Sequence, residues 1–315
     1  MALERERAEP PGEPEPPARP ALLVLRGLGL GDLLTAVPAL RALRRAFPGH
    51  RLMLAAPARL AELLPLIGGV DDLLDVCGPG PVGLPAPYGV PDVAVNLHGR
   101  GPQSTAALRH TRPGVLLAHA PEEGGPPWRE LHEVRRWCAF LEWYGIHADP
   151  EDLAIRAPGG SKDPAEVVVH PGAASIARRW PPDRFARVAA ELPGVVITGV
   201  ERELGLRVAA LAGLPEERVL RTGLLELAEV VAGARLVICG DTGMAHLATA
   251  LGTPSVVLFG PMSPALWGPP RGGRHVALWK GRRGDPHGTR PDPGLLEIGV
   301  PDVLDAAFGL LEVSV

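Results

Sequence analysis

The sequence predicts two α/β domains, each built on a doubly wound parallel sheet, that face each other across a cleft. Short apolar runs ending in glycine alternate with segments whose apolar residues recur at helical spacing, which is typical of parallel sheets covered by helices. The chain has 315 residues, more than one domain usually contains, and the alternation restarts after a stretch rich in Pro and Gly at 157–166. We therefore expect a disordered tail at 1–20, an N-terminal domain at 21–160 and a C-terminal domain at 161–315.

In the N-terminal domain, the first strand is predicted at residues 21–27, where an apolar run ends at a glycine. A helix is expected over 29–49, because apolar residues follow helical spacing until Pro48 and Gly49 end the pattern. The remaining expected elements are a strand at 50–57, a helix at 58–67, a surface loop at 78–91, a strand at 91–99 and an amphipathic helix at 128–146.

The C-terminal domain repeats the same alternation, beginning with a strand that ends at His170. The expected elements after it are a helix at 181–192, a strand at 194–200, helices at 202–213 and 224–234, a strand at 236–240, a helix at 244–252 and a strand at 255–260. Each half is therefore expected to form its own parallel sheet.

Composition excludes several classes of protein. The net charge is −4, which gives no broad cationic surface for a nucleic-acid backbone. The three cysteines are far apart, so neither a disulfide framework nor a zinc site is indicated. The tail lacks an apolar core, and the apolar runs elsewhere are much shorter than the roughly 20 residues that span a bilayer. We expect a cytoplasmic protein without a metal, in which any membrane contact is peripheral.

A glycine-rich loop joins the first predicted strand to the first helix, in the segment RGLGLGDLLT. Gly27, Gly29 and Gly31 lack the sixth-position glycine of a dinucleotide fingerprint, so a Rossmann-type cofactor is not indicated. The helix N-terminus exposes backbone N–H groups that suit an anion or a reacting group. Asp32, the only carboxylate of this loop, is a candidate catalytic base, although an aspartate at a helix start more often caps the helix.

The segment HPGAASIARRWPPDRF places two arginines just before a helix. Arg178 and Arg179 could bind a diphosphate there, because guanidinium groups pair bidentately with phosphate oxygens. Two solvated surface arginines are an equally good interpretation of this segment alone.

The segment CGDTGMAHLATALGTPSVVLFGP, at residues 239–261, contains more polar loop residues than packing explains. The backbone N–H groups of Thr242 and Gly243 would face a phosphate at a helix N-terminus, and His246, one turn later, could donate to the same group. Asp241 is an anion and would suit sugar hydroxyls better. Taken singly, Asp241 could be a cap and His246 a core histidine, but together these residues favour a ligand site.

Other chemistry-bearing patterns are few. His98 and His170 each follow a predicted strand and could be catalytic residues or turn residues. The sequence has no GxSxG serine elbow, no HExxH pair and no Walker lysine loop, which disfavours hydrolases, zinc proteases and P-loop kinases.

The three glycine-rich segments, in this order and at this spacing, resemble the family 9 glycosyltransferases, the bacterial heptosyltransferases that build the lipopolysaccharide inner core from ADP-heptose. The most specific part is GDTGMAHLATALGTPSVVLFGP, which is similar to the family's D-T-G-x-x-H core with its G-x-P and F-G-P run. ARRWPPDRF resembles the family's basic-x-Trp-Pro element, and the glycine loop resembles its N-terminal segment. The resemblance covers nearly everything after the tail and implies a GT-B fold of two Rossmann-like domains.

The resemblance also implies residue roles. Asp32 would be the base, Arg178 with neighbouring Arg179 would contact the donor diphosphate, and Glu201, or Glu203 as a fallback, would bind the ribose. The acceptor-side loop would contain Gly29, Gly31 and His98.

The expected function is transfer of a heptose-like sugar from a nucleotide-diphosphate donor such as ADP-heptose to a glycan, lipid-linked or small-molecule acceptor. The resemblance implies an inverting reaction that needs no metal and no cofactor. Met262 and the loop at 96–105 depart from the family pattern, which leaves the acceptor open. The alternatives are a sugar-nucleotide epimerase of the same fold and a noncatalytic nucleotide-sugar binder.

Overall fold

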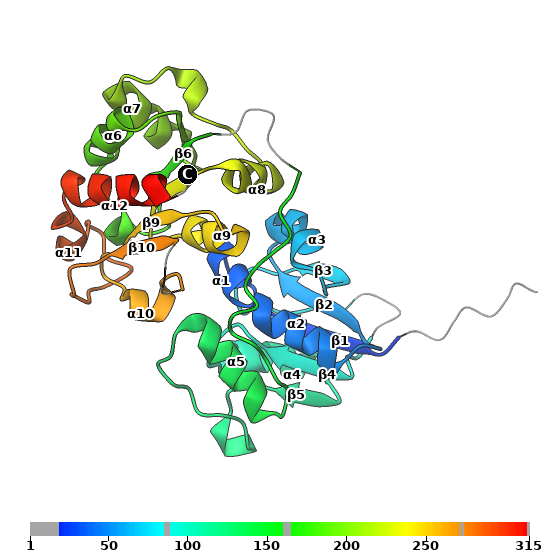
Figure 1. Ribbon diagram of the computed structural model, residues 1–315. Helices are drawn as coiled ribbons and strands as arrows, with labels where there is room; N and C mark the ends of the chain where they lie inside the picture. Colours follow the sequence, from blue (N-terminus) through cyan, green and yellow to red (C-terminus); the bar gives the residue numbers. More distant parts are fainter. Residues whose placement is uncertain (1–18, 85–88, 160–164, 271, 273, 314–315) are drawn as a thin grey trace, which may run out of the picture.

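The structure is a computed structural model that describes residues 19–84, 89–159, 165–270, 272 and 274–313. Within these residues the chain forms two five-stranded parallel sheets, each with its own helices, in an N-terminal and a C-terminal half (Figure 1). Nearly all of the expected tail, and residues 160–164 of the expected linker, lie outside the described residues.

The N-terminal sheet has the strand order β3-β2-β1-β4-β5. Its strands are β1 (Ala21–Leu25), β2 (Arg51–Ala56), β3 (Asp72–Asp75), β4 (Val93–Asn96) and β5 (Val115–Leu117). The helices are α1 (Leu30–Thr35), α2 (Val37–Ala46), η1 (Ala58–Leu63), α3 (Leu64–Ile67), α4 (Gln103–His110), η2 (Pro121–Glu123) and α5 (Glu133–Trp143).

The C-terminal sheet has the strand order β10-β9-β8-β6-β7. Its strands are β6 (Val167–His170), β7 (Val195–Ile197), β8 (Leu236–Gly240), β9 (Ser255–Leu258) and β10 (His275–Leu278). The helices are η3 (Ile176–Arg178), α6 (Pro182–Glu191), α7 (Arg202–Ala212), η4 (Glu216–Arg218), α8 (Leu224–Gly233), α9 (Gly243–Leu251), α10 (Pro264–Trp267), α11 (Pro293–Leu296) and α12 (Val300–Val313).

Both sheets have their central strands buried on both faces. Every residue of β1 and of β8 is buried, which explains why these strands read as continuous apolar runs rather than as alternating patterns. The strand order reverses between β1 and β4 in one sheet and between β6 and β8 in the other. Ligands of open α/β sheets bind at the carboxyl ends of the strands beside such reversals. The motifs of the sequence follow three of these four strands.

The helix expected over 29–49 is in fact two helices, α1 and α2, with a break at Ala36. Pro38 explains the break, because proline has no N–H to donate within a continuous helix and its ring clashes with the preceding turn. At the second position of α2, by contrast, proline is well tolerated.

Two further expectations change. The helix expected from residue 128 begins only at Glu133, because the backbone of His132 (φ −52°, ψ 137°) is not helical. The segment expected as a helix at 58–67 is a 3₁₀ helix followed by a short α-helix. Several short, partly exposed elements were not expected from the sequence, among them β3, α4, β5 and β10.

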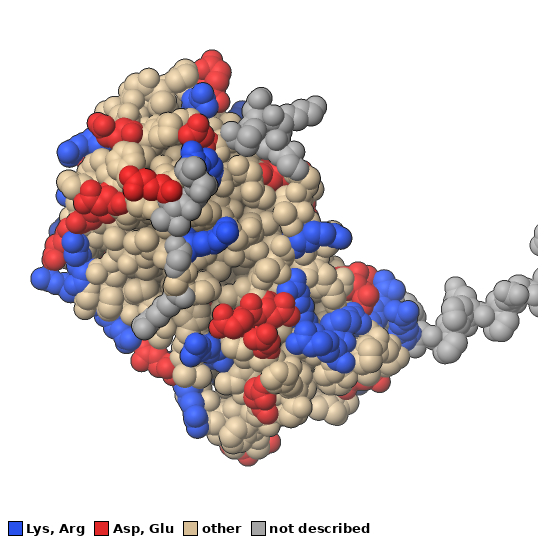
Figure 2. All heavy atoms as spheres, in the orientation of Figure 1, with Lys and Arg blue, Asp and Glu red and all other residues tan. Residues whose placement is uncertain are grey.

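Acidic and basic side chains both occur on the face drawn in Figure 2. Among the described residues, several opposite charges are paired, such as Arg41 with Asp152 and Arg51 with Asp72. Across the described ranges, no helix combines the length and the apolar character needed to cross a bilayer.

Candidate active site

The loops after β1 and β8 meet between the two halves, where α1 packs against α9 (Figure 1). A Cβ atom added to Gly31 would lie 2.7 Å from Cδ2 of His246, and one added to Gly243 would lie 2.9 Å from Cβ of Leu30. Real Cβ atoms do not approach this closely, so the two glycines allow the first turns of α1 and α9 to touch. The predicted acceptor-side loop and the predicted donor loop are therefore in direct contact.

Asp32 lies in the first turn of α1, where its carboxylate has two different environments. Its Oδ2 accepts a hydrogen bond from the backbone N–H of Gly29 at 3.2 Å, which is the capping contact. Its Oδ1 lies 3.4 Å from Nη2 of Arg26, and 27% of the side chain is exposed. The capping bond uses only Oδ2, so Oδ1 and part of the side-chain surface are not used for capping. The role of Asp32 as the base stays a prediction.

Arg26, at the end of β1, is a residue that sequence reasoning missed. Its side chain is fully buried, and it donates to the backbone carbonyls of Asp32 and Leu97 and to Oε1 of Glu133. Burial lowers its pKa to about 10, and the charge of Asp32 opposes this shift. The guanidinium is therefore charged at neutral pH. The sequence feature that could have identified Arg26 is its position as the single charged residue at the end of an otherwise apolar strand.

His98 follows β4 at the same edge of the sheet. Its backbone N–H donates to Oδ1 of Asn96, whose amide in turn donates to the hydroxyls of Ser104 and Thr105. Burial lowers the pKa of His98, the charge of Arg26 adds to this effect, and Asp32 opposes it. Its Nδ1 is buried without a hydrogen-bond partner among the described residues.

Arg178 and Asp241 come together on the C-terminal side. Nη1 of Arg178 lies 3.6 Å from Oδ2 of Asp241 and donates to the backbone carbonyl of Asp241 at 3.4 Å. Asp241 is buried, and burial raises its pKa while Arg178 opposes the shift. Nε of Arg178 is buried and has no acceptor in the described part of the chain.

Arg179 and Glu201, which were expected to contact different parts of the donor, are paired with each other. Nη1 and Nη2 of Arg179 donate to the two carboxylate oxygens of Glu201 at 3.0 and 2.6 Å. About half of the Glu201 side chain is exposed. Glu203, the fallback, is also exposed and lies in the first turn of α7.

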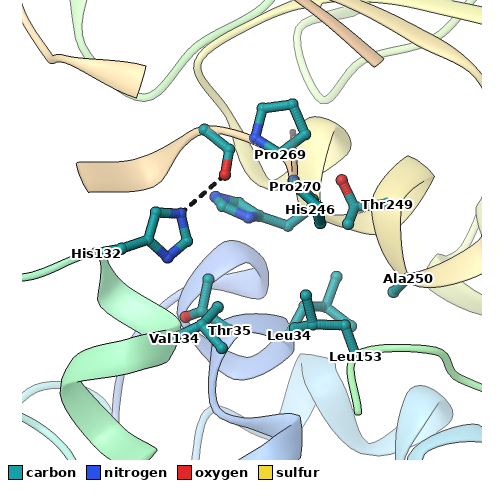
Figure 3. Close-up of a pocket in the computed structure, with 11 residues that line it drawn as sticks. Leu34, Thr35, His132, Val134, Leu153, His246, Thr249, Ala250, Pro269 and Pro270 are labelled. Atoms are coloured by element: carbon teal, nitrogen blue, oxygen red, sulfur yellow. Dashed lines mark hydrogen bonds between the residues drawn. The ribbon is translucent and has the colours of Figure 1, made fainter. Parts of the chain in front are cut away.

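The first turn of α9 contains the remaining predicted donor residues. Thr242 caps the helix, because its hydroxyl accepts from the backbone N–H of Met244 at 3.2 Å, and Gly243 is the first helical residue. His246 borders a cavity of about 20 Å³ lined by residues of both halves (Figure 3). Burial lowers its pKa to about 4, helped by the charges of His132 and Arg26. The imidazole is therefore neutral at neutral pH.

His132 is a second residue that sequence reasoning missed. It precedes α5 in the N-terminal half, and its Nε2–H donates to the backbone carbonyl of Gly268 in the C-terminal half at 2.9 Å. Figure 3 shows its ring beside that of His246. No sequence pattern marked it, because its partner is 136 residues away.

The fold that these halves build is the GT-B architecture of glycosyltransferases. The structure of E. coli ADP-heptose lps heptosyltransferase II matches 93% of this chain and 99% of its own, with a TM-score of 0.72 and 20% identity. E. coli heptosyltransferase WaaC with ADP matches 94% of this chain and all of its own, with a TM-score of 0.66 and 18% identity. The expected fold class is confirmed.

The profile of glycosyltransferase family 9 (heptosyltransferase) matches residues 126–292, more than half of the sequence, and the chain belongs to this family. Lipopolysaccharide heptosyltransferase 1 of Pseudomonas aeruginosa is 37% identical over 133 residues, or 40% of this chain. The enzyme of the same name from Salmonella typhimurium is 34% identical over 87 residues, or 23% of this chain. These alignments span only 35% and 27% of the two relatives' own lengths.

Proposed function

We propose that this protein transfers a heptose-like sugar from a nucleotide-diphosphate donor, such as ADP-heptose, to a hydroxyl group of a glycan or lipid-linked acceptor. The observation that carries the proposal is the contact between the Asp32 loop and the first turn of α9, because the proposed base and the proposed diphosphate site would then face each other. Family membership and the names of the relatives, which are heptosyltransferases, support the sugar and the donor.

The donor diphosphate would bind between Arg178 and the N-terminus of α9. A buried N–H without an acceptor costs about 1–3 kcal/mol, so Nε of Arg178 favours a ligand that supplies an oxygen. The backbone N–H groups of Thr242 and Gly243 and a ring N–H of neutral His246 would donate to the same anion. Asp241, held by Arg178, would accept from sugar hydroxyls.

The nucleoside would lie beside Glu201 and Arg179. Their ion pair is partly exposed, and such pairs contribute at most about 1 kcal/mol, so it can open at little cost. Glu201 would then accept from the ribose hydroxyls, and Arg179 would turn toward the phosphates.

In the proposed reaction, Asp32 removes the proton from the acceptor hydroxyl. The acceptor oxygen then bonds to the anomeric carbon as the bond from that carbon to the diphosphate oxygen breaks, and the electron pair leaves with the nucleoside diphosphate. Attack from the face opposite the leaving group inverts the anomeric centre. Arg178 and the start of α9 stabilise the charge on the departing diphosphate, and the reaction requires no metal or cofactor from the protein.

A lipid-linked acceptor would place the enzyme at the cytoplasmic surface of a membrane as a peripheral protein. Co-sedimentation with vesicles that contain the acceptor lipid, compared with vesicles that lack it, tests this location. A protein that binds neither kind of vesicle, or binds both kinds equally well, would contradict this location.

The transfer itself is tested by incubating the protein with ADP-heptose and heptose-deficient lipopolysaccharide, with ADP release and product mass as readouts. Arg178→Ala should weaken ADP binding strongly, whereas Arg274→Ala, which removes an exposed arginine bonded to Gly252, should leave it unchanged. Formation of an epimer from the donor alone, without an acceptor, would contradict the proposal and favour an epimerase.

A further inference from the structure

We infer that Arg26 and Glu133 act together as positioning residues that hold the Asp32 carboxylate in place while leaving it able to accept a proton. The inference rests on the proposed function, in which Asp32 is the base. It concerns two residues that no sequence pattern marked for a role and that are 107 positions apart in the chain.

The side chain of Arg26 binds the first turn of α1 through several hydrogen bonds. Nε donates to the backbone carbonyl of Asp32 at 3.0 Å, and Nη2 reaches Oδ1 of the same residue at 3.4 Å and the hydroxyl of Thr35 at 3.3 Å. One rigid guanidinium therefore contacts both the backbone and the side chain of Asp32, a fork that a lysine ammonium cannot reproduce. Nη1 also donates to the carbonyl of Leu97, next to His98, which ties the acceptor-side turn to the same group.

Glu133 is the principal counterion of Arg26. Its Oε1 lies 3.0 Å from Nη2 of Arg26, closer than the 3.4 Å to Asp32, and both side chains are almost completely buried. Oε1 also accepts from Nε1 of Trp137 at 2.8 Å, and the Trp137 ring lies 4.9 Å from the guanidinium carbon. Arg136 pairs with the other oxygen of Glu133. The carboxylate is thus held rigidly against Arg26.

The charges of this network alternate in sign, in the order Arg136, Glu133, Arg26 and Asp32. Because Glu133 balances much of the Arg26 charge, Asp32 is oriented by a hydrogen-bond donor without being neutralised by a full ion pair. A base that was locked in a tight, buried ion pair would accept a proton poorly. Removing Glu133 would leave Asp32 as the main carboxylate partner of Arg26, whereas removing Arg26 would take away the cation that pairs with Asp32 among the described residues.

Other titratable groups near Asp32 set the background for any pH measurement. They come from the end of β4, from the segment before α5, from α5 and from α9, and they are His98, His132, Glu133, Arg136 and His246. The three histidines have lowered pKa values, chiefly because of burial. They are therefore neutral at neutral pH in the parent protein.

The two substitutions Arg26→Gln and Glu133→Gln test the inference in the full-length protein. Both should lower kcat with saturating ADP-heptose and acceptor by about 10- to 100-fold, because small displacements of a catalytic group have effects of this size. Both should leave the Kd for ADP unchanged, since the donor site lies on the other half. The acidic limb of the pH dependence of kcat should move to higher pH in Arg26→Gln and to lower pH in Glu133→Gln.

Opposite shifts of the acidic limb distinguish positioning from a structural role, which would not move the limb in opposite directions. Arg41→Gln is the matched control, because Arg41 also holds backbone carbonyls of this half, those of Ile67 and Ala154, but makes no contact with Asp32. It should lower stability and keep kcat and its pH dependence. If Arg26→Gln does not fold, the double variant with Glu133→Gln removes both charges together and should still move the limb to higher pH.

An unchanged kcat, or an acidic limb that stays in place in both single variants, would overturn the inference. Asp32→Asn separates this outcome from failure of the proposed function. If Asp32→Asn is inactive while the Arg26 and Glu133 variants behave as the parent, only the positioning role is wrong. If Asp32→Asn keeps its turnover, the base assignment itself is wrong.

Discussion

Adding one methyl group at Gly31 is expected to impair catalysis by forcing the two halves apart. In Gly31→Ala, the new Cβ would lie 2.7 Å from Cδ2 of His246 and 3.4 Å from Cα of Gly243. To reach an ordinary contact of 3.4 Å, the His246 ring must move by roughly 0.7 Å. The neighbouring cavity of about 20 Å³ leaves some room for the ring, so part of the strain can relax.

Gly243→Ala should be the more damaging of the two substitutions. Its Cβ would meet Cβ of Leu30 at 2.9 Å and the backbone nitrogen of Gly31 at 3.2 Å, and backbone atoms cannot rotate away. Overpacking of this kind typically costs about 1–3 kcal/mol. If that cost falls on the contact between the halves, it corresponds to a loss of about 5- to 150-fold in kcat/KM, with Gly31→Ala at the lower end.

The assay compares kcat/KM and the melting temperature of the two variants with those of Gly49→Ala, where an added Cβ meets nothing within 4 Å. Because the clash lies at the contact between α1 and α9 and not within either sheet, the melting temperature should change less than the activity. If Gly31→Ala and Gly49→Ala have the same kcat/KM, the contact between α1 and α9 is not part of the productive state, and the reasoning fails.

Three further outcomes follow from the site. The pKa of His246 is lowered from 6.5 to about 4, so the unfolded chain binds a proton there before the folded protein does, and the free energy of unfolding should fall as pH drops from 6.5 toward 4. Denaturant titrations at several pH values should show a smaller fall in His246→Gln. Glu201→Gln should raise the Kd for ADP in calorimetry with little change in melting temperature, since its pair with Arg179 is half exposed; an unchanged Kd removes it from the ribose site. His132→Ala loses the hydrogen bond to Gly268, worth about 1 kcal/mol, and should lower kcat/KM about fivefold, whereas unaltered kinetics would exclude this bond from domain contact.

The sequence predicted those parts of the fold that a short local pattern specifies. Apolar runs ending in glycine predicted the central strands β1 and β8, because these strands are buried on both faces. The glycine-rich segments then had to lie at the carboxyl ends of those strands, where ligands of such sheets bind. Short edge strands such as β5, only three residues long and partly exposed, lack that pattern and were missed.

The missed site residues depend on partners that are distant in the sequence. Arg26 meets Leu97 and Glu133, which lie 71 and 107 positions away, so nothing local marked it as more than a strand-end charge. The pairing of Arg179 with Glu201 was likewise hidden, because each residue alone fitted a separate ligand contact. Such contacts follow from the packing of whole elements, which residue spacing does not specify.

In the proposed reaction, Asp32 is the base of a sugar transfer whose donor binds to the other half. The most direct measurement is the turnover of Asp32→Asn with ADP-heptose and acceptor, alongside its Kd for ADP. ADP should bind to Asp32→Asn as it does to the parent protein, because Arg178 and the start of α9 are unchanged, and no glycosylated product should form. Product formation at the parent rate by Asp32→Asn would contradict the role of Asp32 as the base.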